Sequence, residues 1–532
     1  MNHNDFEQLY VTGNFRKLIE TITNLAYSQP STNLTSKERA ICLFYHSRSL
    51  IRLGNVNGAE DLITERYNSE EFSISNLINL NTIINLLITQ GKVDEAIRDG
   101  MDVIAILEER EHELVEKPED QFWFPFPYYF IGIAFFYKFK NDLAWNFFQK
   151  SLGVNQTNLF IRAKCLYYMA FLELEKGGTS KFFNLLEESL VIYRKLDAKQ
   201  GIAWNKAWLG QFYLQRGDFE SANTNFSQAS ELFRTINDLQ GSSLVNSLIG
   251  LMYYQQGNIK QAKEMLELAF ETSIEIGNPM ILSYCVIPLI LLYVDLGDHL
   301  TAQKCINQLE EACKNADSER VKVHSLIAKA IYLKASSRFS EKAQAQNILL
   351  TLLNEEGEKQ SHGSHVWLTS DKSFSFLVIT HLAELYLEEF KISEDPKIML
   401  EVQQLIDNQI QRIDEQKFSP ELVELSLLKA KLLLIEGEIE EAIKILENAK
   451  IIARANNFHR IEEKVNWEIT RVDEEFKKWD AAVTVKDRIK EVQLEEYLKK
   501  VQKMVSLHQS LKKEISDDSN IQNCKNANSR IL

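Results

Sequence analysis

The sequence predicts an all-α fold in which about twelve helix pairs stack one after another and end in a long C-terminal helix. Three observations predict it. The 532 residues contain only 8 prolines, the residue that most often interrupts a helix. The 20 glycines recur mainly at fixed offsets. A pattern of small and aromatic residues returns about every forty residues, which indicates a structural repeat.

The clearest copy of this repeat lies at 208–226 and reads WLGQFYLQRGDFESANTNF. It places Gly210 in a first helix, Gly217 and Asp218 in a turn, and Ala222 in a second helix. Glycine suits the end of a helix because it readily adopts positive φ, and the aspartate can accept hydrogen bonds from the free amides of the next helix. The same pattern returns in two further copies, with Gly250, Gly257, Asn258 and Ala262, and then with Gly297, Asp298 and Ala302.

The Leu-Gly-x-x-Tyr, Gly-Asp-Phe and Ala-x-x-x-Phe spacings resemble the tetratricopeptide repeat, a helix-turn-helix unit. The interval between its turn glycines is longer than the roughly 34 residues of the commonest form. In this respect the array is similar to those of the MalT-type regulators and of the kinesin light chain and LGN-like adaptors. The resemblance implies a right-handed α-α superhelix that binds a partner on its concave face.

Turns of this kind are expected throughout an N-terminal array at 1–353. Gly13, Gly54 and Gly91 mark the first three pairs. The fourth pair is irregular, because Phe139 stands where the turn glycine is expected. We expect this pair to pack less regularly than the others.

A polar segment at 354–375 then interrupts the pattern and predicts a loop longer than the other connections. It is either a tolerated insertion or a functional projection. A second set of repeats is expected at 376–479. Its clearest copy contains Gly437 and Ala442, and a last turn is expected at 477–479.

The segment 480–513 contains neither glycine nor proline and predicts one long helix. Its apolar residues recur at helical intervals but form an imperfect heptad. Two roles remain open: the helix caps the last apolar face of the array, or it mediates self-association as a coiled coil. The polar tail at 514–532 is expected to be disordered.

Candidate binding residues follow from the resemblance alone. In the tetratricopeptide family the concave surface is formed mainly by fixed positions of the first helices. Carried over to this sequence, those positions are Phe126, Tyr129, Lys164, Tyr167, Trp204, Gln211, Tyr254 and Tyr284. Most are aromatic, which suits an apolar or extended peptide; the alternative is that they form the core between repeats. The Lys/Asn/Arg pattern by which some family members hold a C-terminal carboxylate is not matched at these positions.

Charge and cysteine content narrow the partners and the compartment. The net charge of -15 disfavours nucleic acid on average. The six cysteines form no C-x-x-C pair, as expected for buried thiols in a reducing compartment. No secretory signal is visible at the N-terminus, and the apolar stretches at 122–137 and 284–294 are too interrupted or too short to span a membrane. We therefore expect a cytoplasmic protein.

Motifs for catalysis, nucleotide binding and metal binding were not found. The pair His362 and His365 is the closest grouping of histidines, and chance explains it better than a metal site does. We therefore expect neither enzymatic activity, nor a cofactor, nor a metal. The sequence favours a scaffold that binds a protein or peptide on the concave face of the superhelix. The alternative is a ligand-sensing regulatory protein of the MalT-like type without its effector domain.

Overall fold

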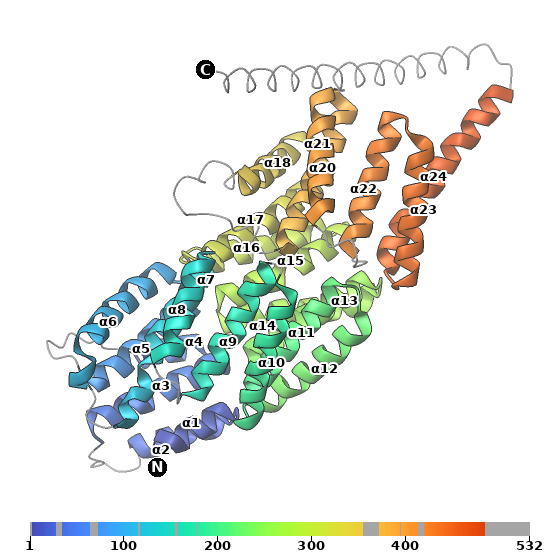
Figure 1. Cartoon of the computed structure of the whole chain (residues 1–532). Coiled ribbons are helices and arrows are strands. Elements are labelled where there is room, and N and C mark those ends of the chain that lie inside the picture. The colour runs from blue at the N-terminus through green and yellow to red at the C-terminus, as the bar shows by residue number, and fades with distance from the viewer. Residues whose placement is uncertain are drawn as a thin grey trace, which may run out of the picture. The chain divides into compact units, whose positions relative to one another are not determined.

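The structure is a computed structural model that describes residues 3–27, 34–63, 73–114, 118–154, 158–176, 178–354, 372–393, 395–412 and 420–484. Every regular element among these residues is a helix (Figure 1). The all-α prediction is therefore confirmed. The helices form two compact units, the first ending at Ser375 and the second formed mainly by residues from Phe376 onward.

Nine helix pairs make up the described part of the first unit. They are α1 (His3–Val11) and α2 (Phe15–Tyr27), α3 (Ser36–Arg52) and α4 (Val56–Asp61), α5 (Ile74–Thr89) and α6 (Val93–Leu114), α7 (Pro125–Tyr137) and α8 (Asn141–Val154), α9 (Leu159–Glu175) and α10 (Thr179–Lys195), α11 (Lys199–Gln215) and α12 (Phe219–Ile236), α13 (Leu239–Gln255) and α14 (Ile259–Ile276), α15 (Pro279–Asp295) and α16 (His299–Ala312), and α17 (Glu319–Lys334) and α18 (Phe339–Asn354). The 3-10 helix η1 (Pro118–Trp123) precedes α7. Consecutive first helices from α9 to α17 begin at intervals of 40 residues.

The second unit contains two further pairs and a final helix. They are α20 (Lys372–Ser393) with α21 (Pro396–Arg412), α22 (Pro420–Glu436) with α23 (Ile439–Ala455), and α24 (His459–Thr484). The turn expected at 477–479 is wrong, because α24 continues through it. That segment contains no glycine or proline to end the helix. The described residues thus hold eleven pairs and α24, close to the expected twelve.

The turns form as the sequence predicts. Gly217 has φ of 72° and Gly257 has φ of 78°, in the left-handed region that glycine adopts without strain. Asp218 is the N-cap of α12, the second helix of the sixth pair, and its carboxylate accepts a hydrogen bond of 3.0 Å from the amide of Ser221. Phe139 takes the same kind of conformation, with φ of 55°, where the fourth pair lacks its glycine.

Small residues let the two helices of a pair approach closely. Gly210 of α11 faces Phe226 of α12, and a Cβ at Gly210 would lie 2.5 Å from that ring. Gly250 of α13 faces Leu266 of α14 in the same way. Ala262 of α14 is fully buried. Gly210 and Gly250 are therefore packing positions within their pairs, and Ala262 is a filled position of the core.

We expect Ala262→Trp to destabilise the protein by about 1–3 kcal/mol, because a large side chain at a filled site forces its neighbours apart. A thermal melt followed by circular dichroism measures the effect. Ala343→Trp is the matched control, since Ala343 is exposed on α18. An unchanged melting temperature for Ala262→Trp would contradict the packing described above.

Several predictions concern residues outside the described ranges. They are the interior of the 354–375 segment, the predicted helix beyond residue 484, the tail at 514–532, the last of the six cysteines (Cys524), and the pair His362 and His365. Among the helices that are described, none combines the length and the apolar character needed to cross a bilayer.

Candidate functional site

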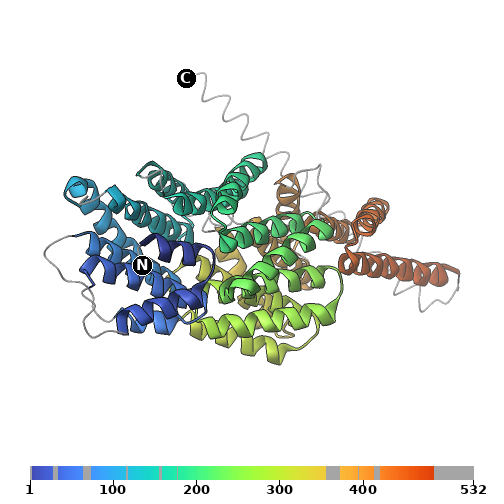
Figure 2. The same cartoon turned by 90° about the horizontal axis from the view of Figure 1, so that it is seen from below.

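The first unit folds back on itself, so that its early turns contact segments more than two hundred residues later. The turn at Gly13 packs against Ile236, and the turn at Gly91 packs against Ala316. Gly13 leaves no room for a side chain, because a Cβ there would lie 2.3 Å from Ile236 Cγ2. The blue helices and the green to yellow helices accordingly lie side by side (Figures 1 and 2). First helices from distant parts of the unit also meet, as α3 and α13 do through Arg52 and Gln240, and we call the side on which they meet the inner face.

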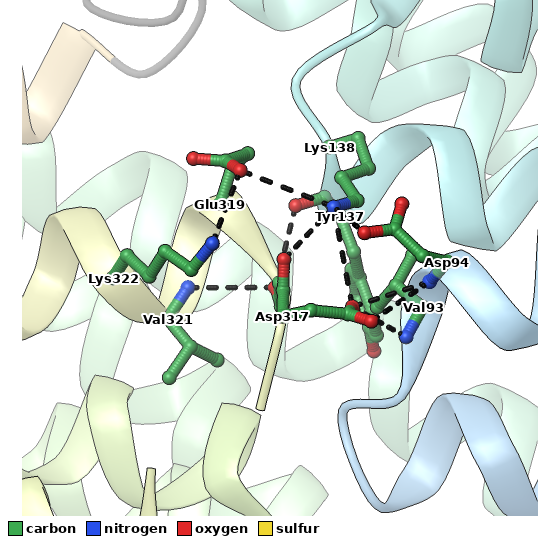
Figure 3. Close-up of polar contacts among 9 residues, drawn as sticks. Val93, Asp94, Tyr137, Lys138, Asp317, Glu319, Val321 and Lys322 are labelled. Atoms are coloured by element: carbon green, nitrogen blue, oxygen red, sulfur yellow. Dashed lines mark hydrogen bonds and ion pairs between the residues drawn. The ribbon is translucent and has the colours of Figure 1, made fainter. Parts of the chain in front are cut away.

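Asp317 makes the first polar contact of this closure (Figure 3). Its Oδ1 accepts a hydrogen bond of 2.6 Å from the amide of Val93, and its Oδ2 accepts one of 3.1 Å from the amide of Asp94. These are the free amides at the N-terminus of α6, where a carboxylate is favourable. The amide of Asp317 in turn donates to the carbonyl of Gly91 at 3.0 Å. The loop before α17 thus caps a helix 224 residues earlier in the chain.

Lys138, at the end of α7, joins the same contact. Its Nζ donates to Asp94 Oδ2 at 2.8 Å and to the carbonyl oxygen of Asp317 at 2.9 Å, and Glu319 lies 3.9 Å away (Figure 3). The ammonium therefore neutralises acidic groups from both sides of the closure.

Arg320, in the first turn of α17, is the buried part of the closure, with 1% of its surface exposed. Its Nε donates to the carbonyl of Phe136 at 2.8 Å, and its Nη2 lies 3.0 Å from Glu175 Oε1. The guanidinium carbon stands 3.9 Å from the centre of the Phe136 ring and 4.2 Å from that of Phe139. One side chain thus connects α17 with α7 and α9.

The eight residues taken from the resemblance all lie on first helices, from α7 to α15. Five are buried: Phe126, Tyr129, Lys164, Tyr167 and Tyr254. The other three keep part of their surface accessible: Trp204, Gln211 and Tyr284. Contact of a partner with these positions stays a prediction, and access is greatest at the last three.

Several of these residues connect neighbouring first helices. The hydroxyl of Tyr254 donates to Asp295 of α15 at 2.6 Å. Trp208 of α11 donates its indole N–H to the hydroxyl of Tyr167. The ring of Tyr284 stands edge-on to His324 of α17, with 4.6 Å between ring centres. These side chains therefore contribute to packing between repeats, the alternative that the sequence left open.

Phe126, Tyr129 and Lys164 are brought together around cations that the sequence did not single out. Arg48 of α3 is 4% exposed, and its guanidinium carbon lies 4.6 Å from the ring centre of Tyr10 and 5.8 Å from that of Phe126. Burial, followed by the neighbouring Tyr193, raises the pKa of Tyr129 well above its usual value. Tyr129 therefore remains a neutral hydroxyl at physiological pH.

Lys164 of α9 lies beside the same group. Its Nζ stands 4.9 Å from the ring centre of Phe160, which in turn lies 6.1 Å from the ring of Tyr10. Burial, followed by the positive charges of Arg52 and Arg48, lowers the pKa of Lys164 well below its usual value. We call Arg48, Arg52 and Lys164 the interior basic cluster.

Arg52 connects this cluster to the other side of the inner face. Its Nη1 donates to Gln240 Oε1 of α13 at 3.2 Å, although the two residues are 188 positions apart. Asp238 is fully buried, and its negative charge favours the protonated forms of both Arg52 and Lys164. Its carboxylate also accepts hydrogen bonds from Gln200 Nε2 at 2.7 Å and from the amide of Gly241 at 3.0 Å.

The sequence did carry a signal for the two arginines. Arg48 and Arg52 are four residues apart on a first helix, and therefore on one face of it. Two cations on the inner stripe of a stacked helix are unusual, because buried charges are rare. The binding positions, however, were carried over only from the fourth pair onward.

The described part of the chain gives little support for a metal site or a reactive cysteine. No group of three histidine, cysteine or acidic side chains there is arranged to hold a metal ion. The five described cysteines are free thiols, four of them buried. Burial raises the pKa of Cys165 to about 12 and that of Cys285 to about 11, so neither is a reactive thiolate.

Comparison with known proteins places a tetratricopeptide repeat at residues 245–273, which cover the second half of α13 and most of α14. With the observed helix pairs, this makes the chain a tetratricopeptide-like helical repeat protein. No curated protein sequence matches the chain.

Solved structures of similar architecture include three helical repeat proteins. A Rap protein complexed with Competence and Sporulation Factor is 16% identical, with a TM-score of 0.40, and the match covers 76% of this chain and 99% of that one. Yeast Tom70 is 15% identical, with a TM-score of 0.36, covering 87% and 91%. Human IFIT1 bound to m7Gppp-AAAA is 15% identical, with a TM-score of 0.34, covering 83% and 95%. At these scores the likeness carries no argument about function.

Proposed function

We propose that the chain is a non-catalytic scaffold that binds a protein or peptide partner on the inner face of its first unit. The observation that carries the proposal is the row of first helices from α7 to α15, which holds all eight candidate residues and in which Tyr167 bonds to Trp208 and Tyr254 to Asp295. Stacked repeats of this kind form extended surfaces for protein recognition. Trp204 and Tyr284 retain accessible aromatic surface on this row, the type of side chain that most often anchors a partner.

A pull-down from native extract tests the proposal. Two baits are compared, the parent protein and a triple variant. The variant carries Trp204→Ala, Gln211→Ala and Tyr284→Ala, at the three candidate residues that are partly accessible. We expect the parent protein to capture a partner and the triple variant to lose at least about tenfold of it, because truncating an aromatic anchor removes about 2 kcal/mol or more of binding energy.

The matched control removes apolar surface elsewhere. Leu300 of α16 and Phe339 of α18 are exposed apolar residues on second helices, and Leu300→Ala with Phe339→Ala should leave capture unchanged. Circular dichroism confirms that each variant is folded. Equal capture by the triple variant would place binding away from this row, and capture of nothing by the parent would contradict the scaffold.

One observation favours the second candidate, a ligand-sensing protein. The interior basic cluster lies within the same inner face, and Asp238 is the acidic group that acts on both Lys164 and Arg52. Such a sensor would be stabilised by a small ligand, since binding to the folded state alone raises the melting temperature.

A further inference from the structure

The inner face of the first unit contains more buried positive charge than its described neighbours balance. Arg48 and Lys164 make no hydrogen bond or ion pair with any described residue and contact aromatic rings instead. Asp238 is the carboxylate that acts on Lys164 and Arg52, and it is already bonded to Gln200 and Gly241. Lys164 and Arg52 therefore share one carboxylate, and among the described residues Arg48 contacts only aromatic rings.

Glu7 of α1 does little to restore the balance. Its negative charge disfavours ionisation of Tyr45, a neighbour of Arg48. Burial, however, raises the pKa of Glu7 itself to about 7. At neutral pH this carboxyl group is therefore only partly ionised. The excess of positive charge remains.

Such an arrangement is unfavourable unless something else occupies it. A buried charge without a partner is strongly disfavoured, and clusters that keep one are concentrated at binding and catalytic sites. A further donor also lacks an acceptor: Gln240 Nε2 is buried and has no hydrogen-bond partner among the described residues. Lys164, with 9% of its surface exposed, still borders accessible space. The cluster therefore offers charge and donors to an anion.

We propose that the interior basic cluster binds the phosphate group of a small phosphorylated ligand. The donors come from three helices, with guanidinium groups from α3, an ammonium from α9 and an amide from α13. This arrangement suits the three oxygens of a tetrahedral phosphate better than a planar carboxylate. A phosphate monoester also carries about -1.5 to -2 charges at pH 7, which matches the excess of positive charge. The rings of Tyr10 and Phe160, which border the cations, would contact the organic part of the ligand.

Thermal shift and calorimetry with inorganic phosphate and phenyl phosphate test this inference. The ligands are used at low millimolar concentration and constant ionic strength, because concentrated phosphate stabilises proteins by exclusion from their surface. Succinate is the carboxylate comparison. We expect both phosphates to raise the melting temperature of the parent protein, and succinate to leave it unchanged.

Lys164→Met is the decisive variant. It should weaken phosphate binding about ten- to a hundredfold, the effect of losing a charge-assisted hydrogen bond. Its melting temperature without ligand should equal or exceed that of the parent, since a buried amine that has no hydrogen-bond partner among the described residues is gone. Arg48→Met is a second variant that removes a positive charge from the interior basic cluster. Lys181→Met is the control, because Lys181 is 74% exposed on α10 and should keep full binding.

Three results would overturn the inference: no phosphate-dependent shift in the parent, an equal shift in Lys164→Met, or an equal shift with succinate. The inference goes beyond the scaffold and does not rest on it. If the pull-down fails but phosphate still raises the melting temperature, only the scaffold is contradicted. If a protein partner is captured but phosphate causes no shift, only the anion site is contradicted.

Discussion

Arg320→Met is expected to destabilise the first unit by about 3–5 kcal/mol, the usual loss when one partner of a buried ion pair is removed. The variant leaves Glu175 and the carbonyl of Phe136 without the guanidinium that lies 3.0 Å and 2.8 Å from them. It also removes a cation from the faces of two rings. Urea titration followed by tryptophan fluorescence measures the loss.

A surface variant and a double variant make this result specific. Arg338→Met removes the same charge from a side chain that is 77% exposed and should change stability by less than about 1 kcal/mol. Adding Glu175→Gln to Arg320→Met should recover part of the loss, because the side chain at 175 then no longer carries a negative charge that has lost its guanidinium partner. Hydrogen exchange at the amides of Val93 and Asp94 reports whether the closure opens. A loss no greater than that of Arg338→Met would mean that Arg320 does not hold the closure.

The local parts of this fold could be predicted from the sequence because their causes are local. Positive φ at Gly54 and Gly217 is visible as glycine at a fixed offset, and the cap at Asp218 follows it directly. Even the irregular turn was recognisable, since Phe139 occupies the position of a glycine and adopts its conformation. Where no helix-ending residue is present, as at 477–479, the pattern predicted a turn that the backbone does not make.

The closure of the first unit could not be predicted in this way. A repeat pattern defines how each pair packs on the next, but not the small rotation between pairs, and that rotation accumulates over the stack. Which loop meets the turn at Gly91 depends on the accumulated angle over 224 residues. The capping of α6 by Asp317 therefore has no signature in either segment alone.

The same limit applies to the candidate site. The family positions correctly identified first-helix residues, yet they could not tell how much of each remains accessible once the unit closes. Tyr254 is buried against its neighbour, whereas Trp204 is not fully covered. Arg48 and Arg52 can be recognised as part of a candidate site only once the fold brings α3 close to Lys164 of α9 and to Gln240 of α13.

Acidification is expected to destabilise the first unit through His324. This residue of α17 is fully buried, with its Nδ1 2.9 Å from the hydroxyl of Ser283. Burial, followed by the positive charge of Arg320, lowers the pKa of His324 to about 3. The unfolded chain binds this proton at its ordinary pKa of about 6.5, so stability falls as the pH drops below that value and continues to fall towards pH 3. Between pH 6.5 and 4.5 the expected loss is about 2–3 kcal/mol.

The measurement compares urea midpoints at pH 7 and pH 4.5 for the parent and His324→Asn. The variant is expected to be less stable at pH 7, because a buried ring is removed, but to lose about 2–3 kcal/mol less on acidification. His299→Asn, on the exposed start of α16, should keep the acid dependence of the parent. An identical acid loss in His324→Asn would contradict the assignment. Arg320→Met should also shrink the acid loss, because removing the second cause of the depressed pKa raises the pKa of His324 in the folded state. Arg320 would then contribute both to the closure of the first unit and to its loss of stability in acid.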